Sequence, residues 1–72
     1  MAMRAEAVRA LINMVKSTSV GADLRAAAAE GLGHAGGESA RAALLEIMQN
    51  TSIAVDIRSA AARALARATQ RE

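Results

Sequence analysis

The chain has 72 residues, which is enough for one small domain. It contains no cysteine and no aromatic residue, and this excludes disulfide scaffolds, thiolate catalysis, Cys-containing zinc sites and stacking platforms for bases. The net charge of +2 is too small to indicate a surface built for phosphate backbones. No apolar run approaches the roughly 18 residues of a membrane span, and the first residues do not resemble a signal peptide. We therefore expect a cytoplasmic protein with no membrane partner.

The first predicted helix covers residues 3–16. Its apolar residues recur with the i, i+3, i+4, i+7 spacing of one helix face. They are Ala7, Val8, Ala10, Leu11, Ile12, Met14 and Val15.

The second predicted helix covers residues 20–34. Ser19 or Thr18 is its expected N-cap, and Asp23 falls in the first turn, where the helix dipole favours a negative charge. Gly36-Gly37 suits a left-handed stop at its C-terminus. This helix carries alanine on two faces, which allows close approach by neighbours on both sides.

The third and fourth predicted helices cover residues 38–49 and 53–69. Asn50 precedes the turn between them, Ser52 or Thr51 is the expected N-cap of the fourth helix, and Asp56 falls in its first turn. The apolar stripe of the fourth helix contains Ile57, Ala60, Ala61, Ala64, Leu65 and Ala68. We expect this stripe to be larger than one neighbouring helix can cover.

These four elements form two copies of one unit. Shifting the sequence by 33 residues aligns residues 7–35 with residues 40–68 without a gap, at 12 identities in 29 positions. The matches include Thr18-Ser19 on Thr51-Ser52, and Asp23 and Arg25 on Asp56 and Arg58, which an alanine-rich composition does not explain. Ankyrin and tetratricopeptide repeats have similar periods, but the first uses a Thr-Pro-Leu-His turn and the second uses aromatic packing. The chain has no proline and no aromatic residue, so neither fits.

The segment Leu24-Arg25-Ala26-Ala27-Ala28-Ala29-Glu30-Gly31-Leu32-Gly33-His34-Ala35-Gly36 resembles the inner helix of phycobilisome-lyase-type HEAT-like repeats. The segments 6–12 and 38–45 resemble the outer helix of the same family. The resemblance covers nearly the whole chain. It implies an all-α fold, namely a short armadillo-like α-solenoid of four helices in two units, as a single domain over residues 1–72 or as part of a longer solenoid. It also implies that Asp23, Arg25, Asp56 and Arg58 form polar pairs that link adjacent repeats.

The segment from Gly31 to Gly36 is a literal G-x-G-x-x-G, the pattern of a dinucleotide-binding turn. That motif requires a strand before the glycines and a helix N-terminus after them. Here the glycines end a helix, where the dipole repels phosphate, so we expect no cofactor. His34 is the only histidine, and no triad or metal set can be assembled around it.

Arg63, Arg67 and Arg71 recur every four residues along the fourth predicted helix. Such a stripe suits a phosphate or an acidic partner, although three arginines at helical spacing are more often a solvated face. We keep it as a possible partner-binding stripe.

We expect a non-catalytic scaffold that binds another protein through its helical surface. Two alternatives remain: a scaffold segment of an enzyme-associated protein such as a lyase accessory, and a weak nucleic-acid-binding module that uses the arginine stripe. Because two units are few for a repeat stack, we also expect self-association as a two-fold homodimer. Its contact would use the fourth helix and the flank of the first around Met3, Val8 and Met14.

Overall fold

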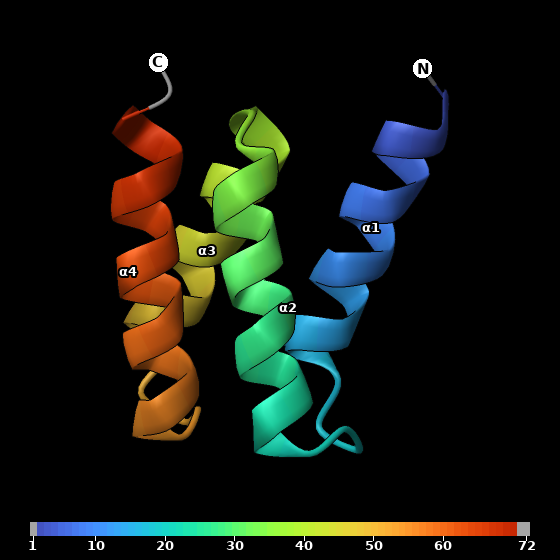
Figure 1. Cartoon of the computed structure of the whole chain (residues 1–72). Coiled ribbons are helices and arrows are strands. Elements are labelled where there is room, and N and C mark those ends of the chain that lie inside the picture. The colour runs from blue at the N-terminus through green and yellow to red at the C-terminus, as the bar shows by residue number, and fades with distance from the viewer. Residues whose placement is uncertain (1, 71–72) are drawn as a thin grey trace.

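The computed structural model describes residues 2–70, and in this range every regular element is an α-helix. The helices are α1 (Ala2–Lys16), α2 (Ala22–Ala35), α3 (Glu38–Gln49) and α4 (Val55–Gln70). They form two antiparallel pairs, α1–α2 and α3–α4, stacked so that α2 lies beside α4 (Figure 1). Helix α2 contacts the other three helices, whereas α1 and α4 do not touch each other. This stacking is a short α-solenoid, as the sequence predicts.

The core lies between the stacked pairs and consists of small and medium side chains. Leu32, Leu44, Ile57 and Val15 are the largest side chains that are fully buried. Alanines fill the space between them, and Ala29, Ala61, Ala64 and Ala68 have no exposed surface. Because alanine projects so little, the α2 and α4 backbones approach closely, and this compensates for the lack of aromatic residues.

The predicted N-caps are wrong. Helix α2 begins at Ala22 after Gly21, and no side chain caps it. Helix α4 begins at Val55, three residues beyond Ser52. The Ser and Thr residues form the connecting turns instead, where the Ser52 backbone N–H donates to Asn50 Oδ1 at 2.9 Å. An Asx turn of this kind satisfies the backbone locally and delays the next helix by about two residues.

The two glycines after α2 form the sharp turn that the sequence predicts. Gly36 and Gly37 have φ angles of +67° and +88°, in the left-handed region that disfavours a Cβ. The Gly36 N–H donates to the Leu32 carbonyl at 3.0 Å and closes the end of α2. Helix α3 then begins directly at Glu38, antiparallel to α2.

The apolar stripe of α4 is larger than one neighbouring helix can cover, as the sequence predicts. Ile57, Ala60, Ala61, Ala64 and Ala68 are all buried, and only Leu65 of that stripe is half-exposed. The stripe is covered by two neighbours rather than one, since α4 packs against both α2 and α3. Val8 is buried as well, and the Met3 side chain lies outside the described residues. Among the residues expected at a two-fold contact, Val8 and most of the α4 stripe are thus buried, while Met14 and Leu65 are half-exposed.

Candidate interaction surface

Each unit is held together by the same arginine contact. Arg25 Nε donates to the Val15 carbonyl at 2.8 Å, and Arg58 Nε donates to the Met48 carbonyl at 2.9 Å. Both acceptors lie in the last turn of the preceding helix, where a carbonyl has no partner within the helix. The repeated arginine thus ties the second helix of a unit to the end of the first.

These contacts correct the expected role of the Asp–Arg pairs. Arg25 and Arg58 bind within their own unit, not between units. Asp23 and Asp56 lie in the first turns of α2 and α4, as predicted. Neither carboxylate has an ion pair or a side-chain hydrogen bond in the described part of the chain. Residues two positions apart on a helix do not face each other, so Asp and Arg at this spacing cannot serve one contact.

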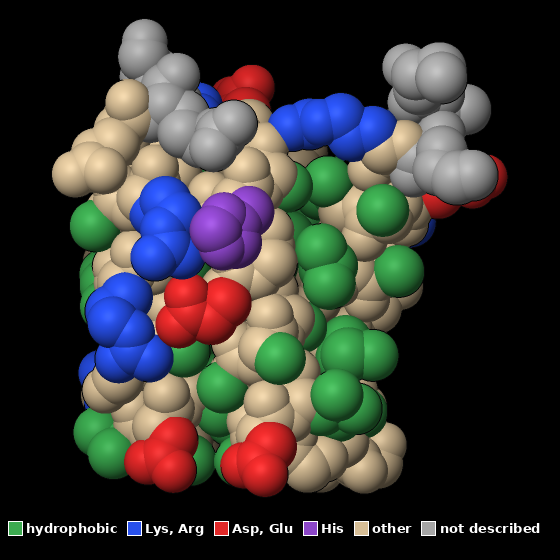
Figure 2. Space-filling view, viewed as in Figure 1, with side chains coloured by type: hydrophobic (Ala, Val, Ile, Leu, Met, Phe, Trp, Pro, Cys, Tyr) green, Lys and Arg blue, Asp and Glu red, His purple; other side chains and the backbone are tan. Residues whose placement is uncertain are grey.

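The polar contact between units is made by residues of the predicted arginine stripe. Arg63 Nη2 lies 3.3 Å from Glu30 Oε2, and Arg67 Nη1 lies 3.3 Å from Glu30 Oε1. Arg67 Nη1 also lies 3.5 Å from His34 Nε2. Figure 2 shows these charges gathered over α4 and α2. Arg71, the third residue of the stripe, lies outside the described residues.

The 33-residue repeat explains the pairing of Arg63 with Glu30. Arg63 stands 33 residues after Glu30, so the two occupy the same position of successive units. In the stack, equivalent positions of neighbouring second helices lie side by side, and opposite charges there attract. A second ion pair, Lys16 Nζ to Glu46 Oε1 at 3.1 Å, joins α1 to α3 between positions that are not equivalent in the repeat.

Helices α2 and α4 cross most closely at Gly33. A Cβ built on Gly33 would lie 2.8 Å from the Cα, Cβ and carbonyl oxygen of Ala64. No side chain fits there unless the α4 backbone moves. A Cβ on Gly31 would meet only the Leu11 side chain, at 3.4 Å, which is close to ordinary contact. The predicted ending of a helix is thus only part of what these glycines do, because Gly33 is also required for helix packing.

One end of the stack is an apolar surface that we call the N-terminal open face. It comprises Ala7, Ala10, Leu11 and Met14 of α1, with Leu24, Ala27 and Gly31 of α2. All of these residues are exposed or half-exposed, and Leu24 has 53% of its surface accessible. Their equivalents in the second unit are Ala40, Ala43, Leu44, Ile47, Ile57, Ala60 and Ala64, all of which are buried. Figure 2 shows hydrophobic side chains along α1 and its border with α2, where this face lies.

The other end is a surface that we call the C-terminal open face. It comprises Leu45 and Met48 of α3, with Ser59, Ala62, Leu65 and Ala66 of α4, all exposed or half-exposed. Most of their equivalents in the first unit are covered by the second: Val15, Ala29, Leu32 and Gly33 are buried, and Ile12 and Ala26 are half-buried. The two open faces are therefore equivalent, position by position, to the two halves of the interface between the units.

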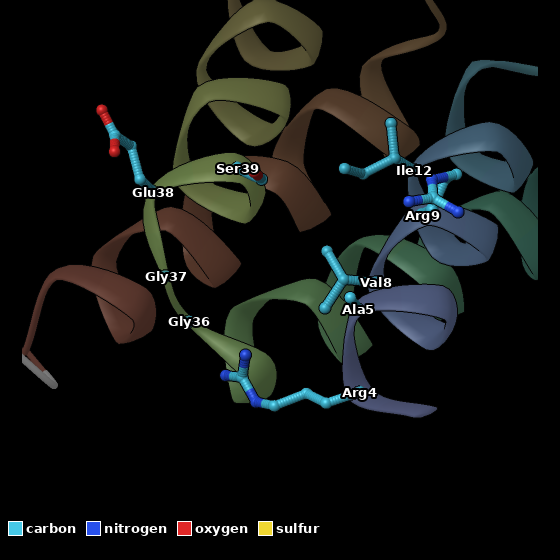
Figure 3. A pocket seen from close by; sticks show the side chains of 9 residues that line it. All are labelled: Arg4, Ala5, Val8, Arg9, Ile12, Gly36, Gly37, Glu38 and Ser39. Atoms are coloured by element: carbon cyan, nitrogen blue, oxygen red, sulfur yellow. The ribbon is translucent and has the colours of Figure 1, made fainter. Parts of the chain in front are cut away.

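A hollow of about 330 Å³ lies between α1 and the start of α3. Arg4 and Arg9 project from α1 at its edge, and Figure 3 shows Arg4 extended toward the turn at Gly36, with Glu38 pointing away. Arg4 Nη2 donates to the Ala35 carbonyl at the end of α2. This arginine is thus engaged in holding α1 to α2.

The described residues hold neither a cluster of metal-binding side chains nor a membrane-spanning helix. No group of three or more His, Cys, Asp or Glu side chains lies together in a way that could hold a metal ion. None of the four helices combines the length and apolar character needed to cross a membrane.

Comparison with known families gives a match for the central part of the chain. A family model described as PBS lyase HEAT-like repeat matches residues 24–50, which contain most of α2, the glycine turn and all of α3. No curated protein and no solved structure gives a significant match. The matched segment includes the glycine-rich helix end on which the sequence resemblance was based. The described residues form an all-helical short solenoid, and residues 24–50 are similar to a PBS lyase HEAT-like repeat.

Proposed function

We propose that the chain is a non-catalytic helical-repeat scaffold that binds another protein through its open faces. The observation that supports this most directly is the state of Leu24, which is 53% exposed while its equivalent Ile57 is 1% exposed. Large apolar side chains that cluster on an exposed surface commonly mark an interaction site. Repeat stacks act in this way because each unit covers only its neighbours. We place this role in the cytoplasm, as the sequence predicts.

The nucleic-acid alternative is less well supported. Arg63 and Arg67 both contact Glu30, and this carboxylate offsets part of their positive charge. A phosphate backbone would have to compete with that carboxylate. Binding of this kind would weaken steeply with added salt, whereas binding through apolar side chains would change little.

A site-specific photo-crosslinker tests the proposal. We would place a photoreactive residue at Ala27, in the N-terminal open face, and a control at Asp56. Asp56 and its equivalent Asp23 are both exposed, so that position lies outside the interface between units. After irradiation of cells that naturally make the chain, we expect protein adducts from position 27 and few from position 56. Equal labelling at both positions, or none at position 27, would contradict the proposal.

A further inference from the structure

The two open faces are equivalent, in repeat position, to the two faces that meet between the units of the chain. Along the stack, the first unit presents to the second a surface equivalent to the C-terminal open face. The second unit packs against it with a surface that is equivalent to the N-terminal open face. We propose that the partner of these faces is a second copy of the chain, stacked head to tail, with α4 of one copy against α2 of the next. This inference rests on the proposed scaffold function and names its partner.

Glycine placement sets how closely two copies can approach. Inside the chain, a Cβ on Gly33 of the first unit would lie 2.8 Å from the Cα, Cβ and carbonyl oxygen of Ala64 of the second. At a junction between copies, the same two positions would be Ala66 of one copy and Gly31 of the next. Because Ala66 carries a Cβ and the backbone at Gly31 remains, α4 of one copy would lie farther from α2 of the next than these helices lie inside the chain. Gly31 lies within α2, where glycine is less favourable than alanine, and a Cβ there would meet only the Leu11 side chain.

Charge supports the head-to-tail arrangement. Inside the chain, Glu30 meets the Arg63 that stands at the same position of the next unit. At a junction, Arg63 of one copy would lie beside Glu30 of the next, again with opposite charges. The pair formed by Lys16 and Glu46 would be replaced by Gln49 and Asn13, which are uncharged and able to share a hydrogen bond. No like charges meet at these matched positions.

The exposed leucines take equivalent places. Leu24 would occupy the position in which Ile57 is buried, and Leu45 would occupy that of half-buried Ile12. Each junction covers the C-terminal open face of one copy and the N-terminal open face of the next. The remaining open face of each copy stays free to bind a further copy. Such a heterologous contact propagates along a line instead of closing as a two-fold dimer.

The test uses one blocked variant for each face. Gly31→Arg blocks the N-terminal open face, and Ala66→Arg blocks the C-terminal open face. Ala42→Arg is the matched control, because the first unit already carries Arg9 at that position beside the second unit. Circular dichroism verifies that each variant remains helical. Sedimentation equilibrium with interference optics, which the absence of aromatic residues requires, then gives the mass from micromolar to millimolar concentration.

We expect the unmodified chain and Ala42→Arg to exceed the single-chain mass of 7.4 kDa progressively as concentration rises. Each blocked variant alone should associate roughly tenfold or more weakly. An equimolar mixture of the two blocked variants should form a one-to-one dimer that grows no further, through the single pair of faces left intact. Masses that stay at one chain throughout, or a mixture that behaves as its separate components, would overturn the proposal. If the chain does not self-associate but the crosslinking experiment gives adducts to a different protein, the proposed scaffold function is still supported.

Discussion

The two units have nearly the same pattern of side chains but very different burial. Leu44 of α3 is fully buried, whereas Leu11 at the same position of α1 is half-exposed. On the second helices, Ile57 is buried and Leu24 is exposed. At another pair of equivalent positions the order is reversed: Leu32 of the first unit is buried, and Leu65 of the second unit is half-exposed. Place in the stack, more than residue type, therefore decides which side chains contribute to stability.

Truncation of one equivalent pair should give the largest contrast. Ile57→Ala removes a buried side chain from the α2–α3–α4 core, and we expect it to destabilise the fold by about 2–5 kcal/mol. Leu24→Ala removes a side chain that is half in water, and its cost should stay below about 1 kcal/mol. Urea unfolding at low micromolar concentration, followed by circular dichroism, measures both. Similar costs would show that the two units are not stacked as described.

The two helical glycines should respond to the same substitution with opposite signs. Gly33→Ala places a Cβ against the α4 backbone at Ala64, and overpacking of this kind should cost about 1–3 kcal/mol. Gly31→Ala should stabilise the isolated chain by about 0.5–1 kcal/mol, because alanine is the better helix former and the added Cβ meets only Leu11. Thermal unfolding of the dilute proteins gives both signs. A loss of stability in both variants would place the close crossing elsewhere.

The repeated arginines should behave alike in both units. Arg25→Ala and Arg58→Ala each remove a charge-assisted bond to an otherwise unpaired carbonyl, at an expected cost of about 1–3 kcal/mol. Arg63→Ala, which removes only an exposed contact, should cost less than about 0.5 kcal/mol. The measurement is again urea unfolding. Equal effects at Arg58 and Arg63 would remove the distinction between the bond within a unit and the ion pair between units.

The ion pair between units should have the smallest effect. Glu30 is 33% exposed, and Arg63 and Arg67 are 64% and 44% exposed. Solvent screens contacts of this kind, so Glu30→Gln should cost less than about 0.5 kcal/mol, and less still in high salt. Asp23→Asn, at a carboxylate with no partner among residues 2–70, is the comparison. A salt dependence no greater than that of Asp23→Asn would mean that the pair adds nothing to the stacking.

The sequence predicts the helices and the repeat well because both follow from periodicity. Observed helix limits differ from the predicted limits by at most two residues, and the largest differences are at the starts of α2 and α4. Those starts were misplaced because Ser and Thr favour caps and turns equally, and local sequence does not separate the two. Before α4, the hydrogen bond from the Ser52 N–H to Asn50 Oδ1 stabilises the turn, so Ser52 does not cap the helix.

The surface was harder to predict because it depends on how the units stack. The arginine stripe was considered for a partner, whereas Arg63 and Arg67 contact Glu30 of the same chain. A signal was present: Glu30 and Arg63 have opposite charges at one repeat position. The width of the α4 stripe indicates more than one neighbour, but the sequence does not show that both neighbours are helices of the same chain. The close approach of α2 to α4 depends on Gly33, whose role appears only in three dimensions.

Amide hydrogen exchange at Leu11 and Leu44 tests the unequal burial of the two units most directly. Each leucine follows an alanine, so the two amides have closely similar intrinsic exchange rates. In a dilute solution, we expect the Leu44 amide to exchange only through unfolding of most of the fold, because α3 packs against three helices. Leu11 should exchange faster through opening of α1, whose outer side is uncovered. Equal exchange at the two positions would contradict the stacked arrangement.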